Sequence, residues 1–161
     1  MQSSRRTATV VTVSDRSFSG AREDRSGPLA ASLLHDAGWS ADVVVVPDEL
    51  DQIADAIRSA AARGDSLVVT TGGTGLGPRD VTPEATEPLL DRTVPGIAER
   101  IRTVGVEKLP QAMLSRGLAG IVGHSLVVNL AGSPGAVADG VPVILTVAGH
   151  VADQLRGGDH Q

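Results

Sequence analysis

The sequence predicts an α/β protein, a three-layer α/β/α fold with a mainly parallel, mixed central sheet. Strand-like and helix-like patterns alternate over residues 7–75 in the order β-α-β-α-β, as in parallel sheets with right-handed crossovers. The apolar content of 41% consists mostly of Val, Leu, Ile and Ala, because Phe18 and Trp39 are the only Phe, Trp or Tyr residues. This composition is typical of buried parallel strands and of the helices that cover them.

The first strand and helix are marked by a change from β-branched to polar residues. Residues 7–14 form a β-branched run that predicts a strand, and the polar residues 15–25 predict a loop. A helix is expected from Ser26, which can cap it. Pro28 is tolerated in the first turn, where its missing N–H is not needed, and Gly38 can end the helix.

A second helix and two more strands complete the alternating pattern. Residues 43–46 and 66–71 are apolar runs that predict strands, and apolar residues at helical spacing predict a helix over 49–63. Asp48 is well placed to cap that helix and Gly64 to end it. In parallel sheets ligands collect at the carboxyl ends of such strands.

The rest of the chain predicts helices around a hairpin. Helices are expected from residue 82, over 95–109 and over 141–155, where apolar residues recur at helical spacing. The apolar runs 117–122 and 125–130, separated by two residues, predict a hairpin that makes the sheet mixed.

The length of the chain favours one domain. A chain of 161 residues can bury one core and is too short for two ordinary domains. We expect a single domain over residues 1–161, with its core at about 6–156 and a loose tail at 157–161.

Charge and composition exclude several classes of function. The net charge of −5 and the lack of aromatic stacking residues argue against nucleic acid as a partner. The sequence contains no cysteine, which excludes disulfides and thiolate zinc ligands. The apolar run after Arg5 and Arg6 ends at Asp15, so neither a signal peptide nor a membrane span is expected, and a cytoplasmic location is predicted.

A glycine-rich loop is the strongest single motif. Residues 70–77, Thr-Thr-Gly-Gly-Thr-Gly-Leu-Gly, directly follow a predicted strand. Consecutive glycines let backbone N–H groups point into one concavity, and Thr71 and Thr74 add hydroxyl donors, which together suit phosphate oxygens. The alternative is a tight turn that needs positive φ. Neither a P-loop nor a dinucleotide fingerprint is present, because Pro78 and Arg79 follow the loop.

Two carboxylates, Asp48 and Asp80, follow the second and third predicted strands. If these strands are neighbours, the two side chains can face one crevice and offer oxygen ligands to Mg²⁺ beside substrate phosphates. As alternatives, Asp48 can be a helix cap, and Asp80 can pair with Arg79 or Arg116.

Arg116 and Ser133 are further candidates for binding an anion, through a guanidinium fork and a turn hydroxyl. A surface arginine and an ordinary Gly-Ser-Pro turn are the alternatives. The sequence holds no convincing nucleophile, so a reaction here is expected to proceed by positioning and charge neutralisation, as in phosphoryl and nucleotidyl transfer.

Six motifs occur in order between residues 14 and 133, within a longer stretch of resemblance that runs from about residue 9 to 155. They are Ser-Asp-Arg at 14–16, Val-Pro-Asp-Glu at 46–49, Thr-Thr-Gly-Gly-Thr-Gly at 70–75, Pro-Arg-Asp-Val-Thr-Pro-Glu-Ala-Thr at 78–86, Met-Leu-Ser-Arg at 113–116 and Asn-Leu-x-Gly-Ser at 129–133. In these motifs the sequence resembles the Mog/MoaB family of molybdenum cofactor biosynthesis, which includes the G domain of gephyrin.

The resemblance implies a molybdopterin adenylyltransferase, in which the terminal phosphate of molybdopterin attacks the α-phosphate of Mg-ATP and pyrophosphate leaves. It also implies a homotrimer and hand-over of the product to a molybdenum insertion protein. The residues that the resemblance places at the nucleotide are Thr71, Gly72, Gly73, Thr74 and Gly75, with Ser14 and Asp15 as further members. Those that it places at molybdopterin are Ser115, Arg116, Gly132 and Ser133. Asp48 and Asp80 would be the catalytic residues that act through Mg²⁺.

One position departs from the family pattern. Ala131 stands where members commonly have Pro, which would fix the turn backbone, so a looser substrate-side loop is expected here. A binding module without turnover and an assembly scaffold are the alternative functions.

Overall fold

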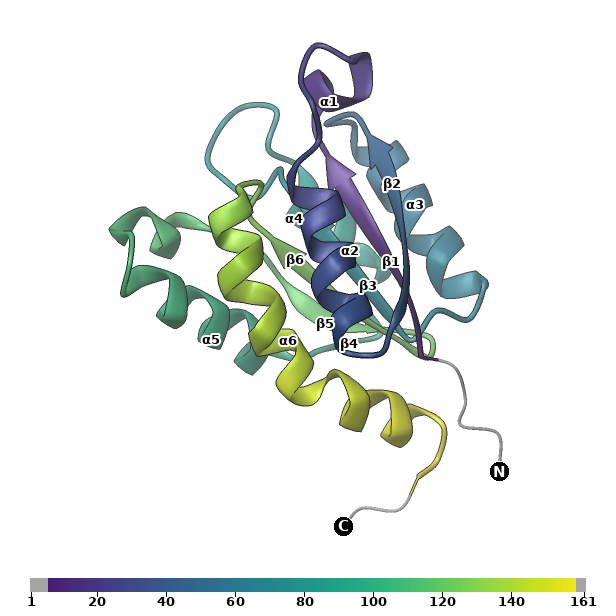
Figure 1. Cartoon of the computed structure of the whole chain (residues 1–161). Coiled ribbons are helices and arrows are strands. Elements are labelled where there is room, and N and C mark those ends of the chain that lie inside the picture. The colour runs from purple at the N-terminus through teal and green to yellow at the C-terminus, as the bar shows by residue number, and fades with distance from the viewer. Residues whose placement is uncertain (1–5, 159–161) are drawn as a thin grey trace.

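Parallel strands form the centre of the sheet. The computed structural model describes residues 6–158, and within them one sheet has the order β2-β1-β3-β6-β5-β4 (Figure 1). The parallel strands are β1 (Thr7–Val13), β2 (Ser40–Val46), β3 (Leu67–Thr71) and β6 (Ser125–Leu130). The short strands β4 (Arg92–Thr93) and β5 (Ala119–Val122) add two antiparallel pairs, β4 with β5 and β5 with β6. The predicted mixed, mainly parallel sheet is confirmed.

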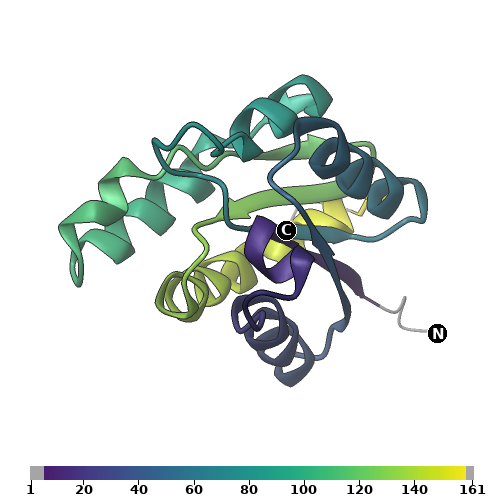
Figure 2. The same cartoon turned by 90° about the horizontal axis from the view of Figure 1, so that it is seen from above.

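Helices cover both faces of the sheet, as the view from above shows (Figure 2). On one face lie α2 (Ser26–Asp36), α5 (Pro95–Val106) and α6 (Pro134–Leu155). On the other lie α3 (Leu50–Ala62) and α4 (Thr82–Thr86). The three-layer prediction is therefore correct.

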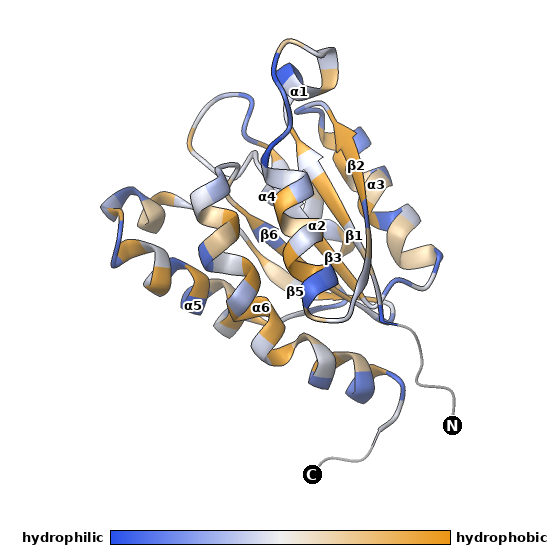
Figure 3. Ribbon diagram, in the orientation of Figure 1, coloured by the Kyte–Doolittle hydropathy of each residue, from blue (hydrophilic) through white to orange (hydrophobic). Residues whose placement is uncertain are grey.

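Alternate residues of the central strands belong to two separate cores. Val10, Val69 and Val128 pack with α2, α5 and α6, whereas Val11 and Val68 pack with α3 and α4. Successive strand residues point to opposite faces, so both faces of these strands are apolar, as Figure 3 shows. By length and composition α6 is apolar enough to cross a membrane, but its buried face packs on the first of these cores.

Several elements differ from the sequence prediction. The segment predicted as a loop after β1 contains a short helix, α1 (Asp15–Ser19), capped by the Ser14 hydroxyl. The 3-10 helices η1 (Glu87–Leu89) and η2 (Pro110–Leu114) and the strand β4 were not predicted. The tail residues 159–161 lie outside the part of the chain that the structure describes.

Three predicted helix starts are corrected. Helix α6 begins at Pro134 instead of residue 141, because the Ser133 side chain caps it and Pro134 suits its first turn. Asp48 does not cap α3, whose N-cap residue is Glu49 without a side-chain hydrogen bond. Ser26 does not cap α2, because its hydroxyl donates to Gly132 O.

The parallel strands all end at one edge of the sheet, and the loops that follow them meet there (Figure 1). Helix α5 packs beside α6, and η2 folds back against α5. We call α5 and η2 together the α5–η2 arm. The sheet edge, the start of α6 and this arm enclose the main cavity.

Candidate functional site

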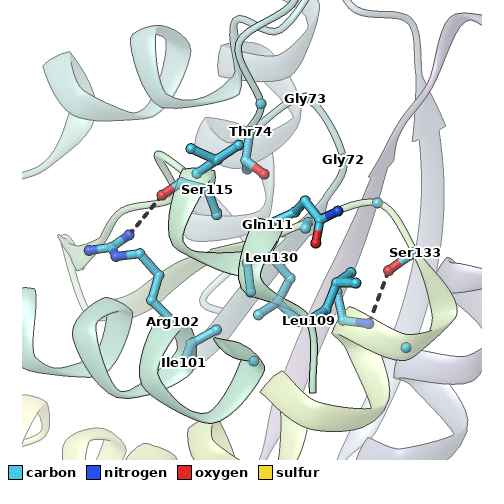
Figure 4. Close-up of a pocket in the computed structure, with 18 of the residues that line it drawn as sticks. Gly72, Gly73, Thr74, Ile101, Arg102, Leu109, Gln111, Ser115, Leu130 and Ser133 are labelled. Atoms are coloured by element: carbon cyan, nitrogen blue, oxygen red, sulfur yellow. Dashed lines mark hydrogen bonds between the residues drawn. The ribbon is translucent and has the colours of Figure 1, made fainter. Parts of the chain in front are cut away.

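A cavity of about 620 Å³ opens at this edge of the sheet (Figure 4). Its size is typical of small-molecule sites. It is lined by the ends of β1 and β6, the glycine loop, the start of α6 and the α5–η2 arm. Of the predicted site residues, the cavity lining contains Ser14, Asp48, Gly72, Gly73, Thr74, Gly75, Asp80, Ser115, Gly132 and Ser133. The structure therefore brings together most of the residues that the sequence analysis selected.

The glycine loop fits its place only without side chains. Gly72 and Gly73 have φ of 109° and 69°, and a Cβ atom would lie 2.2 Å from Val13 O at Gly72 and 2.3 Å from Thr82 Oγ1 at Gly73. The loop is therefore a tight turn with positive φ and also a wall of the cavity. The two interpretations of the motif are compatible.

Two predicted residues of the nucleotide site do not line the cavity. The Thr71 hydroxyl donates to Ala131 O at 2.9 Å, which ties the glycine loop to the turn after β6. Thr71 is therefore committed within the protein, whereas Thr74 remains on the cavity wall. Asp15, the second residue, is held by Arg79 and Asp48.

Asp48 and Asp15 join the loops after β1 and β2. The backbone N–H of Asp15 donates to Asp48 Oδ2, and that of Asp48 donates to Asp15 Oδ1, both at 2.9 Å. Burial raises the pKa of Asp48, and the charges of Asp15 and Asp80 raise it further. The Asp48 carboxylate is therefore a half-buried anion that a cation in the cavity would stabilise.

Arg79 connects these loops to the glycine loop. Its Nε and Nη2 donate to the two carboxylate oxygens of Asp15 at 3.1 and 3.0 Å, and Nη2 also donates to Glu49 at 3.0 Å. Hydrogen bonding to Arg79 lowers the pKa of Asp15. Asp80 forms neither of the ion pairs that were considered as alternatives.

Asp80 instead closes its own loop. Its Oδ2 accepts the backbone N–H of Gly77 at 2.8 Å, and its N–H donates to Gly77 O. The close approach of Asp80 leaves no room for a Cβ at Gly75 or Gly77, where it would lie 2.9 Å from Oδ2. The other carboxylate oxygen, Oδ1, has no hydrogen-bond partner within residues 6–158.

Arg116 binds the glycine loop from outside the cavity. Its Nε donates to Gly75 O and its Nη2 to Asp80 O, both at 2.9 Å, and Nη1 pairs with Glu84. It is not among the described residues that line the cavity. Arg116 is therefore placed to hold the loop, and its neighbour Ser115 is the cavity residue of this motif.

Residues of the α5–η2 arm and of α6 were missed by the sequence analysis. Arg102 donates to Ser115 O and Gly117 O and so supports the segment that carries Ser115. Lys108 and Asp139 line the cavity and form an ion pair. No short motif marks these residues, although Lys108 is the only lysine in the sequence, which was an available signal.

The carboxylates fit a magnesium ion that also binds substrate phosphates. No group of three or more His, Cys, Asp or Glu residues within 6–158 forms a metal site. Asp48 and Asp80 each use one oxygen in a backbone hydrogen bond and keep the other free of partners among these residues. Mg²⁺ is commonly held by one or two carboxylates together with phosphates and water, so this donor set suits it.

The fold and site define an α/β protein with a cavity of small-molecule size at the carboxyl edge of a parallel sheet, where such folds bind their ligands. Residues 9–150 match the family model described as a probable molybdopterin binding domain, and the chain belongs to this family.

Several relatives are named for molybdenum cofactor biosynthesis or molybdopterin adenylyl transfer. The molybdopterin adenylyltransferase of Pyrococcus furiosus is 37% identical over 152 residues, which are 91% of this chain and 89% of that protein. A molybdenum cofactor biosynthesis bifunctional protein of Synechococcus elongatus is 44% identical over 154 residues, 95% of this chain. The chain spans only 48% of that relative.

Solved structures agree with this assignment. The crystal structure of a molybdopterin biosynthesis protein from Mycobacterium abscessus has a TM-score of 0.89 and 49% sequence identity. The match covers 94% of this chain and 96% of that one.

Proposed function

We propose that this protein is a molybdopterin adenylyltransferase that acts on Mg-ATP. One observation carries the proposal: the glycine loop, Asp48 and Asp80 line a single cavity large enough for a small-molecule substrate. Relatives with this name match nearly the whole chain, which supports the assignment of the reaction.

In the proposed reaction a terminal phosphate oxygen of molybdopterin attacks the α-phosphorus of ATP. A new P–O bond forms, the bond from the α-phosphorus to the bridging oxygen breaks, and pyrophosphate leaves with that oxygen. Magnesium, when bound, neutralises phosphate charge between the two substrates. The protein contributes mainly by positioning the reactants.

Each wall of the cavity has a part in this proposal. The loop Gly72–Gly75 and Ser14 bind the nucleotide, and Ser115, Gly132 and Ser133 bind molybdopterin. Asp48 and Asp80 hold the metal through their free oxygens. Asp15 and Arg116 act indirectly in this proposal. Their hydrogen bonds hold the loops that carry Asp48 and the glycine residues.

The test is pyrophosphate release from ATP in the presence of molybdopterin, with the adenylylated product identified by its added mass. Stoichiometric release that requires both substrates supports the proposal. Binding of both substrates without pyrophosphate release would indicate a binding module, and no binding of either would favour a scaffold.

We also propose that the protein works in the cytoplasm as a homotrimer, and that it passes its product to a molybdenum insertion protein. Met113 of η2 is 59% exposed and does not line the cavity, as expected of a residue on a contact surface. Sedimentation equilibrium tests the assembly: a mass near the 16.4 kDa of one chain would contradict the trimer.

A further inference from the structure

Asp139 is an acidic residue of the cavity wall that the proposed transfer does not use. It lies in the second turn of α6, and its side chain is only 16% exposed. It lines the same cavity as Asp48 and Asp80 but comes from a different wall, because those two follow β2 and β3 at the sheet edge. A buried carboxylate needs a partner to offset the loss of hydration.

The ion-pair partner of Asp139 is a lysine whose side chain can move away from the carboxylate. Lys108 Nζ lies 2.5 Å from Asp139 Oδ1, and the lysine side chain is 71% exposed. No other hydrogen bond to this carboxylate is formed within residues 6–158, so Oδ2 is free of partners there. An exposed ammonium on a flexible stem gains little from one ion pair and regains its hydration when released. Asp139, which is fixed on α6, cannot withdraw in the same way.

The apolar part of the cavity suits a flat ring. Ile101 and Leu109 of the α5–η2 side and Leu130 of β6 line the cavity and lie around one part of it (Figure 4). Aliphatic walls with a small number of placed polar groups are typical of sites that bind a heterocycle and fix its orientation.

The proposed substrate carries a group that matches Asp139. The pyrimidine ring of a pterin presents its N3–H and its 2-amino group on one edge, as two parallel donors. A carboxylate is an acceptor with two oxygens, and it accepts two parallel N–H bonds from a guanidinium in the same manner. We infer that Asp139 is the specificity-determining residue that binds the 2-amino and N3–H edge of the pterin, and that Lys108 occupies its carboxylate in the ligand-free protein.

This inference rests on the proposed function for the pterin substrate, and it assigns opposite effects to the two members of the ion pair. Loss of the Asp139 charge removes an acceptor from the ligand. Loss of the Lys108 charge removes a competitor for that acceptor. If the ion pair served only to hold the turn after α5 against α6, loss of either charge would have the same effect on pterin affinity.

The experiment compares two probes that differ at one group, pterin-6-carboxylate and lumazine-6-carboxylate, which has 2-oxo in place of 2-amino. Dissociation constants are measured by isothermal titration for the full chain without ATP. The wild type should bind the pterin about tenfold or more tightly than the lumazine, because a lost hydrogen bond to a charged group costs about this factor. Equal affinity of the wild type for the two probes would overturn the inference without any variant.

Two variants complete the test. Asp139→Asn keeps the side-chain volume and should abolish or reverse the preference for the pterin, since an amide N–H can donate to the 2-oxo group. Lys108→Met should keep the preference and bind the pterin equally or more tightly. An unchanged preference in Asp139→Asn, or equal weakening by both variants, would refute the role of Asp139.

The control is Asp55→Asn, which breaks the exposed Asp55–Arg58 pair on α3, away from the cavity, and should change neither affinity. Pyrophosphate formation takes no part in these measurements. A protein that shows the preference but no transfer would refute the proposed reaction alone, and active transfer without the preference would refute the inference alone.

Discussion

Asp15 and Asp48 each accept the other's backbone N–H, in two hydrogen bonds of 2.9 Å. This exchange couples the loops that follow β1 and β2, and it occupies one oxygen of Asp48. Asp48 is therefore oriented by hydrogen bonds with Asp15, in the segment after β1, and not by capping α3.

Replacing Asp48 or Asp80 by Asn should reduce adenylyl transfer at least about a hundredfold, because each change removes the charge of a proposed metal ligand, an effect worth several kcal/mol. The folded-state pKa of Asp48 is raised, so its ionised form costs stability at neutral pH, above that pKa. Asp48→Asn should thus melt at the same or a higher temperature at pH 7. Rates and melting curves check both points, and a full rate in either variant would remove that residue from the catalytic assignment.

Arg79→Gln should slow transfer about ten- to hundredfold, because Asp15 loses the partner that holds it against Asp48, and small misplacements are costly in catalysis. Arg79→Lys should recover only part of the rate, since an ammonium cannot form the same paired hydrogen bonds. The matched control is Arg58→Gln, which breaks an exposed pair on α3. Equal rates in Arg79→Gln and the control would show that Asp48 is positioned without Arg79.

Glu84→Gln should lower stability at neutral pH and have no effect in acid. Hydrogen bonding to Arg116 lowers the pKa of Glu84, so the pair stabilises the fold above the ordinary Glu pKa, and this stabilisation is lost as the pH falls through the lowered value. Both side chains are partly exposed, so the loss at pH 7 should not exceed about 1 kcal/mol. Denaturant unfolding at both pH values measures it, and an equal loss in acid would exclude the ion pair as the cause.

Gly73→Val should destabilise the fold and abolish ATP binding, because a side chain there would strike Thr82 in a conformation of positive φ. Gly64→Val is the control for backbone strain alone, since Gly64 also has positive φ but a Cβ would meet nothing within 4 Å. ATP titrations and melting curves of both variants separate the effects. A folded Gly73→Val protein with unchanged ATP affinity would show that the loop is only structural.

Elements whose buried residues form a regular apolar pattern could be predicted from the sequence. Strands β1, β3 and β6 are buried on both faces and appear as apolar runs, so they were found nearly to the residue. Helix α1 buries none of its residues, and β4 has two residues, so neither leaves a periodic signal. The start of α6 was missed because Ser-Pro-Gly fits a turn as well as a capped helix start.

The site was predicted only where its residues lie close together in the sequence. The glycine loop and Asp80 form one continuous motif, and Asp48 follows a recognisable strand. Lys108 and Asp139 meet through the packing of α5 on α6, over a separation that no local pattern records. The contacts of Asp15 and Arg116 also depend on tertiary structure. Because of these contacts, neither residue belongs to the cavity lining.

The burial of β6 on both faces gives the cavity walls of unequal expected stability. Amide hydrogens of β6 should exchange only when the whole molecule opens, so the cavity wall that carries Leu130 should move no more readily than the protein unfolds. Segment η2 contacts mainly α5, and Leu109 just before it and Leu114 at its end are half exposed. The cavity wall that η2 forms can therefore open locally at far lower cost. A ligand should thus enter or leave past the α5–η2 arm while the sheet edge stays in place.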